Sequence, residues 1–84
     1  MTITYTQHAL ARMAERGIDQ QEVEATLKNP IRQISVDHGR IESQGLIERS
    51  GKKLLLRVIS EGCLVVLVVT VMATSKFEKY GVSP

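Results

Sequence analysis

The chain has 84 residues, of which 43% are apolar and 24% are charged, and a formal net charge of +2. This composition excludes a disordered or collagen-like chain, and the length predicts a single domain over residues 1–84. A charge of +2 is too small to indicate nucleic-acid binding, so such a function would depend on where the basic residues lie.

Two stretches of the sequence bear on targeting and on membrane insertion: the opening residues and the longest apolar run. The opening "MTITYTQ" lacks the basic flank and apolar stretch of a secretion signal, which predicts a cytoplasmic protein. The longest apolar run, "CLVVLVVTVMA", is too short to cross a bilayer as a helix, and its valines favour a central strand. Cys63 is the only cysteine and lies in this run, so we expect a buried thiol and no disulfide.

The N-terminal third predicts a strand followed by a helix. "TITY" alternates and is β-prone, Thr6 can cap a helix, and Gly17 supplies its left-handed end. The helix would bury one face, formed by Ala9, Leu10, Met13 and Ala14.

A second helix is predicted over residues 20–28. Asp19 and Glu22 have the spacing of a capping box, which marks the start of a helix. Pro30 ends the helix because the residue before a proline is pushed out of helical geometry.

The rest of the chain predicts strands and turns. "IRQISVD", "IESQGLIERSGKK", "LLLRVIS" and "CLVVLVVTVMATS" are strand-like, with Gly39 in a turn, Gly45 and Gly51 at bends or bulges, and Glu61-Gly62 at a tight hairpin. The order is β-α-α followed by an antiparallel meander of three or four strands, that is, of the β-α-α-β-β-β type. We therefore expect an α+β fold, with two N-terminal helices packed on one face of a three- to five-stranded antiparallel sheet.

Alternation along the last two strands predicts which side chains leave the core. Leu54, Leu56 and Val58 form one apolar face, so Arg57 points away from it. In the final strand the odd positions from Cys63 to Val71 are uniformly apolar and are assigned to the core. The other face would then be exposed and largely apolar, which predicts a homodimer or another protein partner. That face comprises Leu64, Val66, Val68, Thr70, Met72 and Thr74.

His8, Arg12 and Arg16 recur every four residues, so they form a basic stripe on the first helix. Guanidinium groups match phosphate oxygens, and an imidazole can move a proton near neutral pH, so the stripe has the groups that phosphodiester chemistry needs. The alternative is a solvated face on which Arg12 pairs with Glu15.

A second polar group lies on the last two strands and the C-terminal segment. Arg57 is its strongest member, because a free charge in an apolar strand is costly. These residues would converge beside the first helix: Arg57, Thr70, Thr74, Lys76, Lys79 and Tyr80. His8 and His38 alone fall short of a metal site, and the scarce aromatics do not provide a sheet-wide surface for stacking bases.

Three stretches together resemble a prokaryotic family of unassigned function: "HALARMAERGI", "EVEATLKNP" and "VVTVMATSKFEKY". By its order of elements, this family looks like the RelE/ParE and barnase-like ribonuclease toxins. The resemblance implies a metal-independent endoribonuclease that is neutralised by a small antitoxin protein. It also implies that His8 is the general base or acid, that Arg12 and Arg16 contact phosphate, and that Thr70 or Thr74 supplies a hydroxyl group.

The predicted function is therefore a toxin-like endoribonuclease without a metal or other cofactor, in which an RNA 2′-hydroxyl attacks the adjacent phosphorus. The predicted catalytic residues are His8, Arg12 and Arg57. The predicted substrate-binding residues are Arg16, Thr70, Thr74, Lys76 and Tyr80. The alternative is a non-catalytic, dimeric protein-interaction module whose apolar sheet face binds protein.

Overall fold

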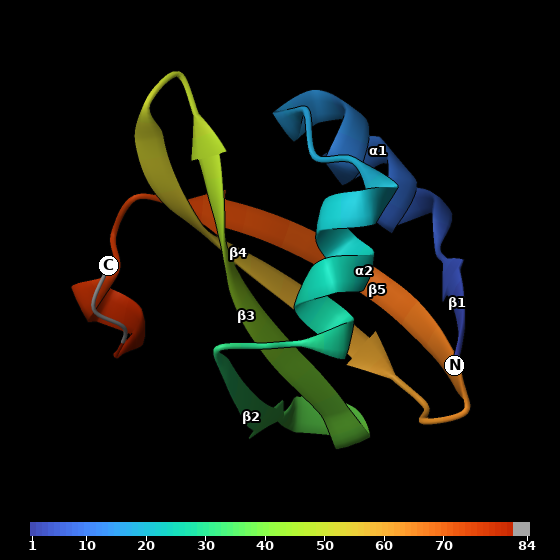
Figure 1. Ribbon diagram of the computed structural model, residues 1–84. Coiled ribbons are helices and arrows are strands. Elements are labelled where there is room, and N and C mark those ends of the chain that lie inside the picture. Colours follow the sequence, from blue (N-terminus) through green and yellow to red (C-terminus); the bar gives the residue numbers. More distant parts are fainter. Residues whose placement is uncertain (82–84) are drawn as a thin grey trace.

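Two helices lie against one face of a five-stranded sheet in a computed structural model that describes residues 1–81, apart from the side chain of Glu78 (Figure 1). The elements are β1 Thr2–Tyr5, α1 Gln7–Arg16, α2 Gln20–Lys28, β2 Arg32–Val36, η1 Asp37–Gly39, β3 Arg40–Arg49, β4 Lys52–Glu61, β5 Val65–Thr74 and η2 Glu78–Tyr80. The predicted α+β class and element order are confirmed.

The strand order is β1-β5-β4-β3-β2. The strands from β2 to β5 pair antiparallel with their neighbours, whereas β1 pairs parallel with β5. The sheet is thus mixed rather than antiparallel throughout. No hairpin joins β1 to β5, so no turn forces these two strands to run in opposite directions.

The helix boundaries follow from the predicted local signals. The Thr6 hydroxyl accepts a hydrogen bond from the amide of Ala9 at 3.0 Å, and Gly17 ends α1 with φ 64°. Asp19 and Glu22 form the capping box that begins α2. No helix in residues 1–81 is long and apolar enough to cross a membrane.

The buried face of α1 is narrower than predicted. Ala9 and Met13 are buried, but Leu10 is 44% exposed and Ala14 is also exposed. The prediction for Leu10 and Ala14 is therefore wrong. The physical reason is that α1 packs chiefly along the single strand β5, so only a narrow stripe of the helix meets the sheet.

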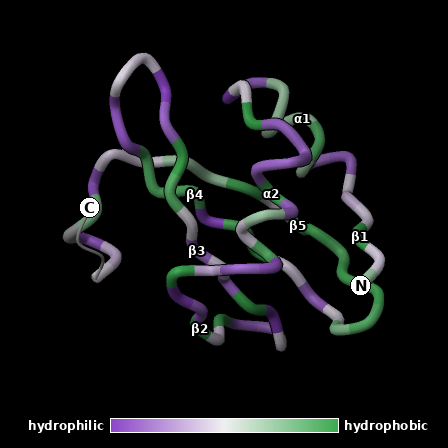
Figure 2. Tube along the Cα trace, viewed as in Figure 1, coloured by the Kyte–Doolittle hydropathy of each residue, from purple (hydrophilic) through white to green (hydrophobic). Residues whose placement is uncertain are grey.

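The main core lies between the helices and the sheet. Side chains from both helices, including Met13 and Val23, pack there with Leu56 and Val58 of β4. Figure 2 shows the hydrophobic colouring along β5, which contributes Val68 and Val71 to the same cluster. Ile47 of β3 and Ile18, which precedes α2, complete the buried contacts of this layer.

An irregularity in β5 overturns the predicted alternation along that strand. Ile59 pairs with Thr70 but the next residue, Ser60, pairs with Val68, so β5 contains an extra residue at this point. Val66 and Val68 are consequently buried, 5% and 0% exposed, and do not form the exposed patch that was predicted.

The turn before β5 also differs from the prediction. The strand begins at Val65, and Cys63 is exposed in the preceding turn rather than buried. Gly51 and Gly62 lie in turns, with φ 78° and 92°, but Gly45 lies inside the regular pairing of β3 with β4 and forms no bulge.

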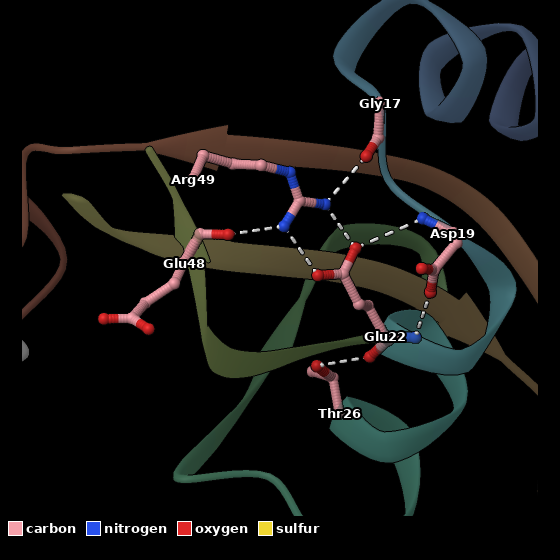
Figure 3. A network of polar contacts seen from close by, with 6 residues as sticks. All are labelled: Gly17, Asp19, Glu22, Thr26, Glu48 and Arg49. Carbon is pink, nitrogen blue, oxygen red and sulfur yellow. Dashed lines mark hydrogen bonds and ion pairs between the residues drawn. The ribbon is translucent and has the colours of Figure 1, made fainter. Parts of the chain in front are cut away.

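An ion-pair network ties the β3–β4 hairpin to the start of α2 (Figure 3). The guanidinium of Arg49 donates to both carboxylate oxygens of Glu22, at 2.8 and 2.5 Å, and to the carbonyl oxygen of Gly17 at 2.7 Å. The hydrogen bonds from Arg49 hold the pKa of the Glu22 carboxyl below its ordinary value. Glu22 therefore serves both the capping box and this tertiary contact.

Candidate functional site

The basic stripe of α1 lies on the outer side of the helix layer. His8 and Arg16 are exposed, and the side chain of Arg12 is 39% exposed. Arg12 lies 3.8 Å from the carboxylate of Glu15, which is the ion pair expected for a solvated helix face. These residues present their charge to solvent. Within residues 1–81 none of them forms a hydrogen bond or ion pair with the other predicted site residues, Arg57, Thr70, Thr74, Lys76 and Tyr80.

Arg57 lies on the opposite side of the sheet. Its neighbours in β4, Leu56 and Val58, belong to the core beneath the helices, so the side chain of Arg57 points to the helix-free face. Gln44 of β3 pairs with Arg57 and therefore shares this face. The sheet thus separates Arg57 from α1, and the predicted convergence beside the first helix does not occur.

Arg57 forms a bidentate ion pair with Glu42. Its Nε donates to Glu42 Oε2 at 2.9 Å and its Nη2 donates to Glu42 Oε1 at 2.8 Å. The two side chains are 17% and 3% exposed. The hydrogen bonds from Arg57 hold the pKa of Glu42 below its ordinary value, although burial acts in the opposite direction. The same pairing raises the pKa of Arg57, so both groups are charged at neutral pH.

The C-terminal segment covers part of this site. The guanidinium carbon of Arg57 lies 4.0 Å from the centroid of the Tyr80 ring, which is a cation–π contact. Lys79 places its ammonium 5.7 Å from the same ring. Arg32 of β2 donates a hydrogen bond to the main-chain carbonyl oxygen of Tyr80.

Together these groups line a groove of about 420 Å³ on the helix-free face, which we call the basic groove. Its lining residues are Arg32, Ile34, Val36, Glu42, Gln44, Arg57, Lys79, Tyr80 and Gly81. Among the side chains that the structure describes in this lining, one is acidic, Glu42, and three are basic, Arg32, Arg57 and Lys79, so these described groups carry a net positive charge. Anionic ligands are therefore favoured there.

The other predicted site residues are only partly brought to this place. Thr70 and Thr74 pair with Ile59 and Leu55 of β4, so they lie on the helix-free face with Arg57, but they do not line the groove. Lys76 is exposed, and its amide donates to the hydroxyl of Thr74. Of the predicted set, Arg57 and Tyr80 are in direct contact.

Sequence reasoning missed Arg32, Glu42 and Gln44. The sequence contained a signal for Glu42 and Gln44: they are two positions apart in "IESQG", so in a strand both side chains would lie on the same face. An arginine in an apolar strand needs a carboxylate nearby, but the sequence does not reveal which strand is the neighbour of β4. No group of three or more metal-binding side chains occurs in residues 1–81.

The fold and groove define an α+β domain with two helices on one face of a mixed sheet and a basic, partly covered groove on the other. The chain belongs to the family described as a domain of unknown function, DUF4258, whose profile matches residues 5–76. No curated protein and no solved structure matches the sequence.

Proposed function

We propose that the basic groove binds the phosphate backbone of single-stranded RNA and that the domain is a toxin-like endoribonuclease. The observation that carries the proposal is the convergence of Arg32, Arg57 and Lys79 around Tyr80 on one face of the sheet. Guanidinium and ammonium groups bind phosphate oxygens, and an aromatic ring offers a surface to an unstacked base.

The ion pair with Glu42 would hold the guanidinium of Arg57 in position to bind a phosphate group. The carboxylate fixes the plane of the guanidinium through two hydrogen bonds. In the described part of the chain, the one partner of Nη1 is the sulfur of Met72, at 3.5 Å. An arginine held in this way loses little further freedom when it donates to a phosphate oxygen. Because Glu42 neutralises part of the charge, most of the attraction for RNA comes from Arg32 and Lys79.

The reaction would be attack of a 2′-oxygen on the adjacent phosphorus, which gives a 2′,3′-cyclic phosphate and a free 5′-hydroxyl. A proton leaves the 2′-hydroxyl and another reaches the departing 5′-oxygen. Tyr80 and Lys79 are the groups of the groove that would move these protons, while Arg57 would stabilise charge on the phosphoryl oxygens.

The binding part of the proposal is tested by the salt dependence of RNA affinity. For three cations in contact with a single strand, the slope of log K against log salt concentration should be about −2. Lys79→Ala should make this slope less steep by about 0.7 and weaken binding. Lys28→Ala, which removes an exposed cation from α2, is the matched control and should leave both unchanged.

The cleavage part is tested with Tyr80→Phe, which removes only the hydroxyl. We expect at least about a 100-fold loss of cleavage with RNA binding retained. His8→Ala should leave cleavage intact. Loss of cleavage in His8→Ala, with Tyr80→Phe fully active, would contradict the groove as the active site and favour α1 instead.

A second candidate is the non-catalytic interaction module. It is favoured by two adjacent apolar residues at the start of β5, Leu64 and Val65, which are 82% and 61% exposed. A second copy of the chain or a small antitoxin protein would cover them. Leu64→Asp should then abolish dimer formation in light scattering, or binding of the partner protein, and the wild-type chain should show no RNA cleavage.

A further inference from the structure

The side chain of Gln44 is fully buried in the lining of the basic groove, and its amide oxygen lacks a hydrogen-bond partner among the described residues. Its exposed fraction is 0%, and its Nε2 donates to Glu42 Oε2 at 2.7 Å. That bond fixes the amide orientation, because the opposite orientation would place the amide oxygen against a carboxylate. The Oε1 atom has no hydrogen-bond partner in the described part of the chain.

A buried acceptor without a partner is uncommon in a folded protein and calls for an explanation. Arg32 is the cross-strand neighbour of Gln44 and carries suitable donors, but its Nη1 is bonded to the carbonyl oxygen of Tyr80 instead. Gln44 is among the residues that line the groove, but its amide oxygen is itself buried, so a donor that enters the groove reaches it only when the side chains above it move.

Glu42 supplies a second acceptor next to Gln44. The two residues are separated by one position in β3 and point to the same face. Glu42 Oε1 accepts one hydrogen bond from Arg57, at 2.8 Å, and a carboxylate oxygen can accept two. The base of the groove therefore offers neighbouring acceptors, whereas Arg57 and Tyr80 provide a cation and an aromatic ring beside them.

From this arrangement we infer that the basic groove is a nucleobase subsite selective for guanine. The Watson–Crick edge of guanine carries two adjacent donors, N1–H and the 2-amino group, which match the acceptors of Gln44 and Glu42. Adenine and cytosine present one donor beside an acceptor nitrogen, and uracil presents one donor between two carbonyl oxygens. The inference deepens the proposed function, on which it rests, by naming the base that is read.

The test uses five-nucleotide RNAs with 2′-O-methyl sugars, which cannot be cleaved by 2′-oxygen attack. Each carries a uracil background and a central guanine, inosine, adenine or uracil, and binding is measured by fluorescence anisotropy at one salt concentration. Inosine lacks only the 2-amino group. We expect the guanine strand to bind about tenfold tighter than the inosine strand, the effect of one well-made hydrogen bond.

Gln44→Met removes the amide at nearly constant volume and should abolish the difference in affinity between the guanine strand and the inosine strand. Gln33→Met is the matched control, because Gln33 donates to Ser43, which lies beside Gln44 in β3 and faces the helices. If Gln44→Met does not fold, the comparison of guanine with inosine in the wild-type chain decides the matter.

Equal affinity of the wild-type chain for all four strands would overturn the guanine subsite and leave RNA binding by the groove intact. Failure to bind any of the strands would overturn the proposed function and the subsite together. Guanine preference that persists in Gln44→Met would place the readout elsewhere and would also refute the assignment.

Discussion

Removing the Glu42 carboxylate should destabilise the protein more than any exposed charge on the same strand. In Glu42→Leu the guanidinium of Arg57, 17% exposed, loses both of its oxygen acceptors, and Gln44 loses the acceptor for its Nε2. Breaking a buried ion pair by deleting one partner costs about 3–5 kcal/mol. Because Arg57 lies at the open side of the sheet and can turn toward water, we expect the lower end, about 3 kcal/mol.

The assay is urea denaturation followed by circular dichroism, together with thermal unfolding. For a domain of this size, about 3 kcal/mol corresponds to a fall in Tm of about 15 °C. Glu48→Leu is the matched control: Glu48 is an exposed carboxylate on β3, and its replacement should change the free energy of unfolding by less than about 0.5 kcal/mol.

The double variant Glu42→Leu with Arg57→Met tests whether the loss of stability comes from the unpaired charge of Arg57. Replacing both partners with apolar residues of similar volume leaves no unpaired charge, so most of the lost stability should return. The reasoning is refuted if Glu42→Leu costs less than about 1 kcal/mol, or if the double variant is no more stable than Glu42→Leu alone.

Three further outcomes are expected. Val68→Asp should unfold the chain, as seen by circular dichroism, because Val68 is fully buried beneath the helices; a folded variant that has merely lost a dimer contact would contradict this placement. Gly45→Ala should cost about 1–3 kcal/mol in urea denaturation, because its Cβ would lie 2.5 Å from the Thr26 hydroxyl oxygen, and Thr26→Ala in the same chain should recover part of the loss. The free energy of unfolding should fall as the pH drops below about 4.3, because Arg49 lowers the folded-state pKa of Glu22, so the stabilisation present above the unfolded pKa is lost as the pH falls through the folded one. Glu22→Gln should weaken this acid dependence, and an unchanged pH profile in that variant would count against the ion pair as its source.

Local signals in the sequence were sufficient for the helices. Thr6, Gly17 and the capping box of Asp19 and Glu22 act through hydrogen bonds and backbone geometry within a few residues, so their outcome does not depend on the rest of the fold. The same holds for Arg57, whose place between two core residues of one strand predicts that it leaves the core.

The alternation along β5 was predicted correctly only beyond the irregularity. Thr70, Met72 and Thr74 leave the core as expected, whereas Val66 and Val68 lie on the helix side. The extra residue in β5 arises from its pairing with β4, and an uninterrupted run of valines carries no mark of where a bulge will fall.

By itself, the sequence determined the α+β class, the helix ends and the presence of a charged residue in an apolar strand, because these depend on neighbours along the chain. The tertiary structure alone decided that Arg57 faces away from the helical basic stripe and meets Glu42, Gln44 and Tyr80. The reason is that strand order, register and the course of the C-terminal segment are set by contacts between distant parts of the chain, and these contacts select which polar side chains share a groove.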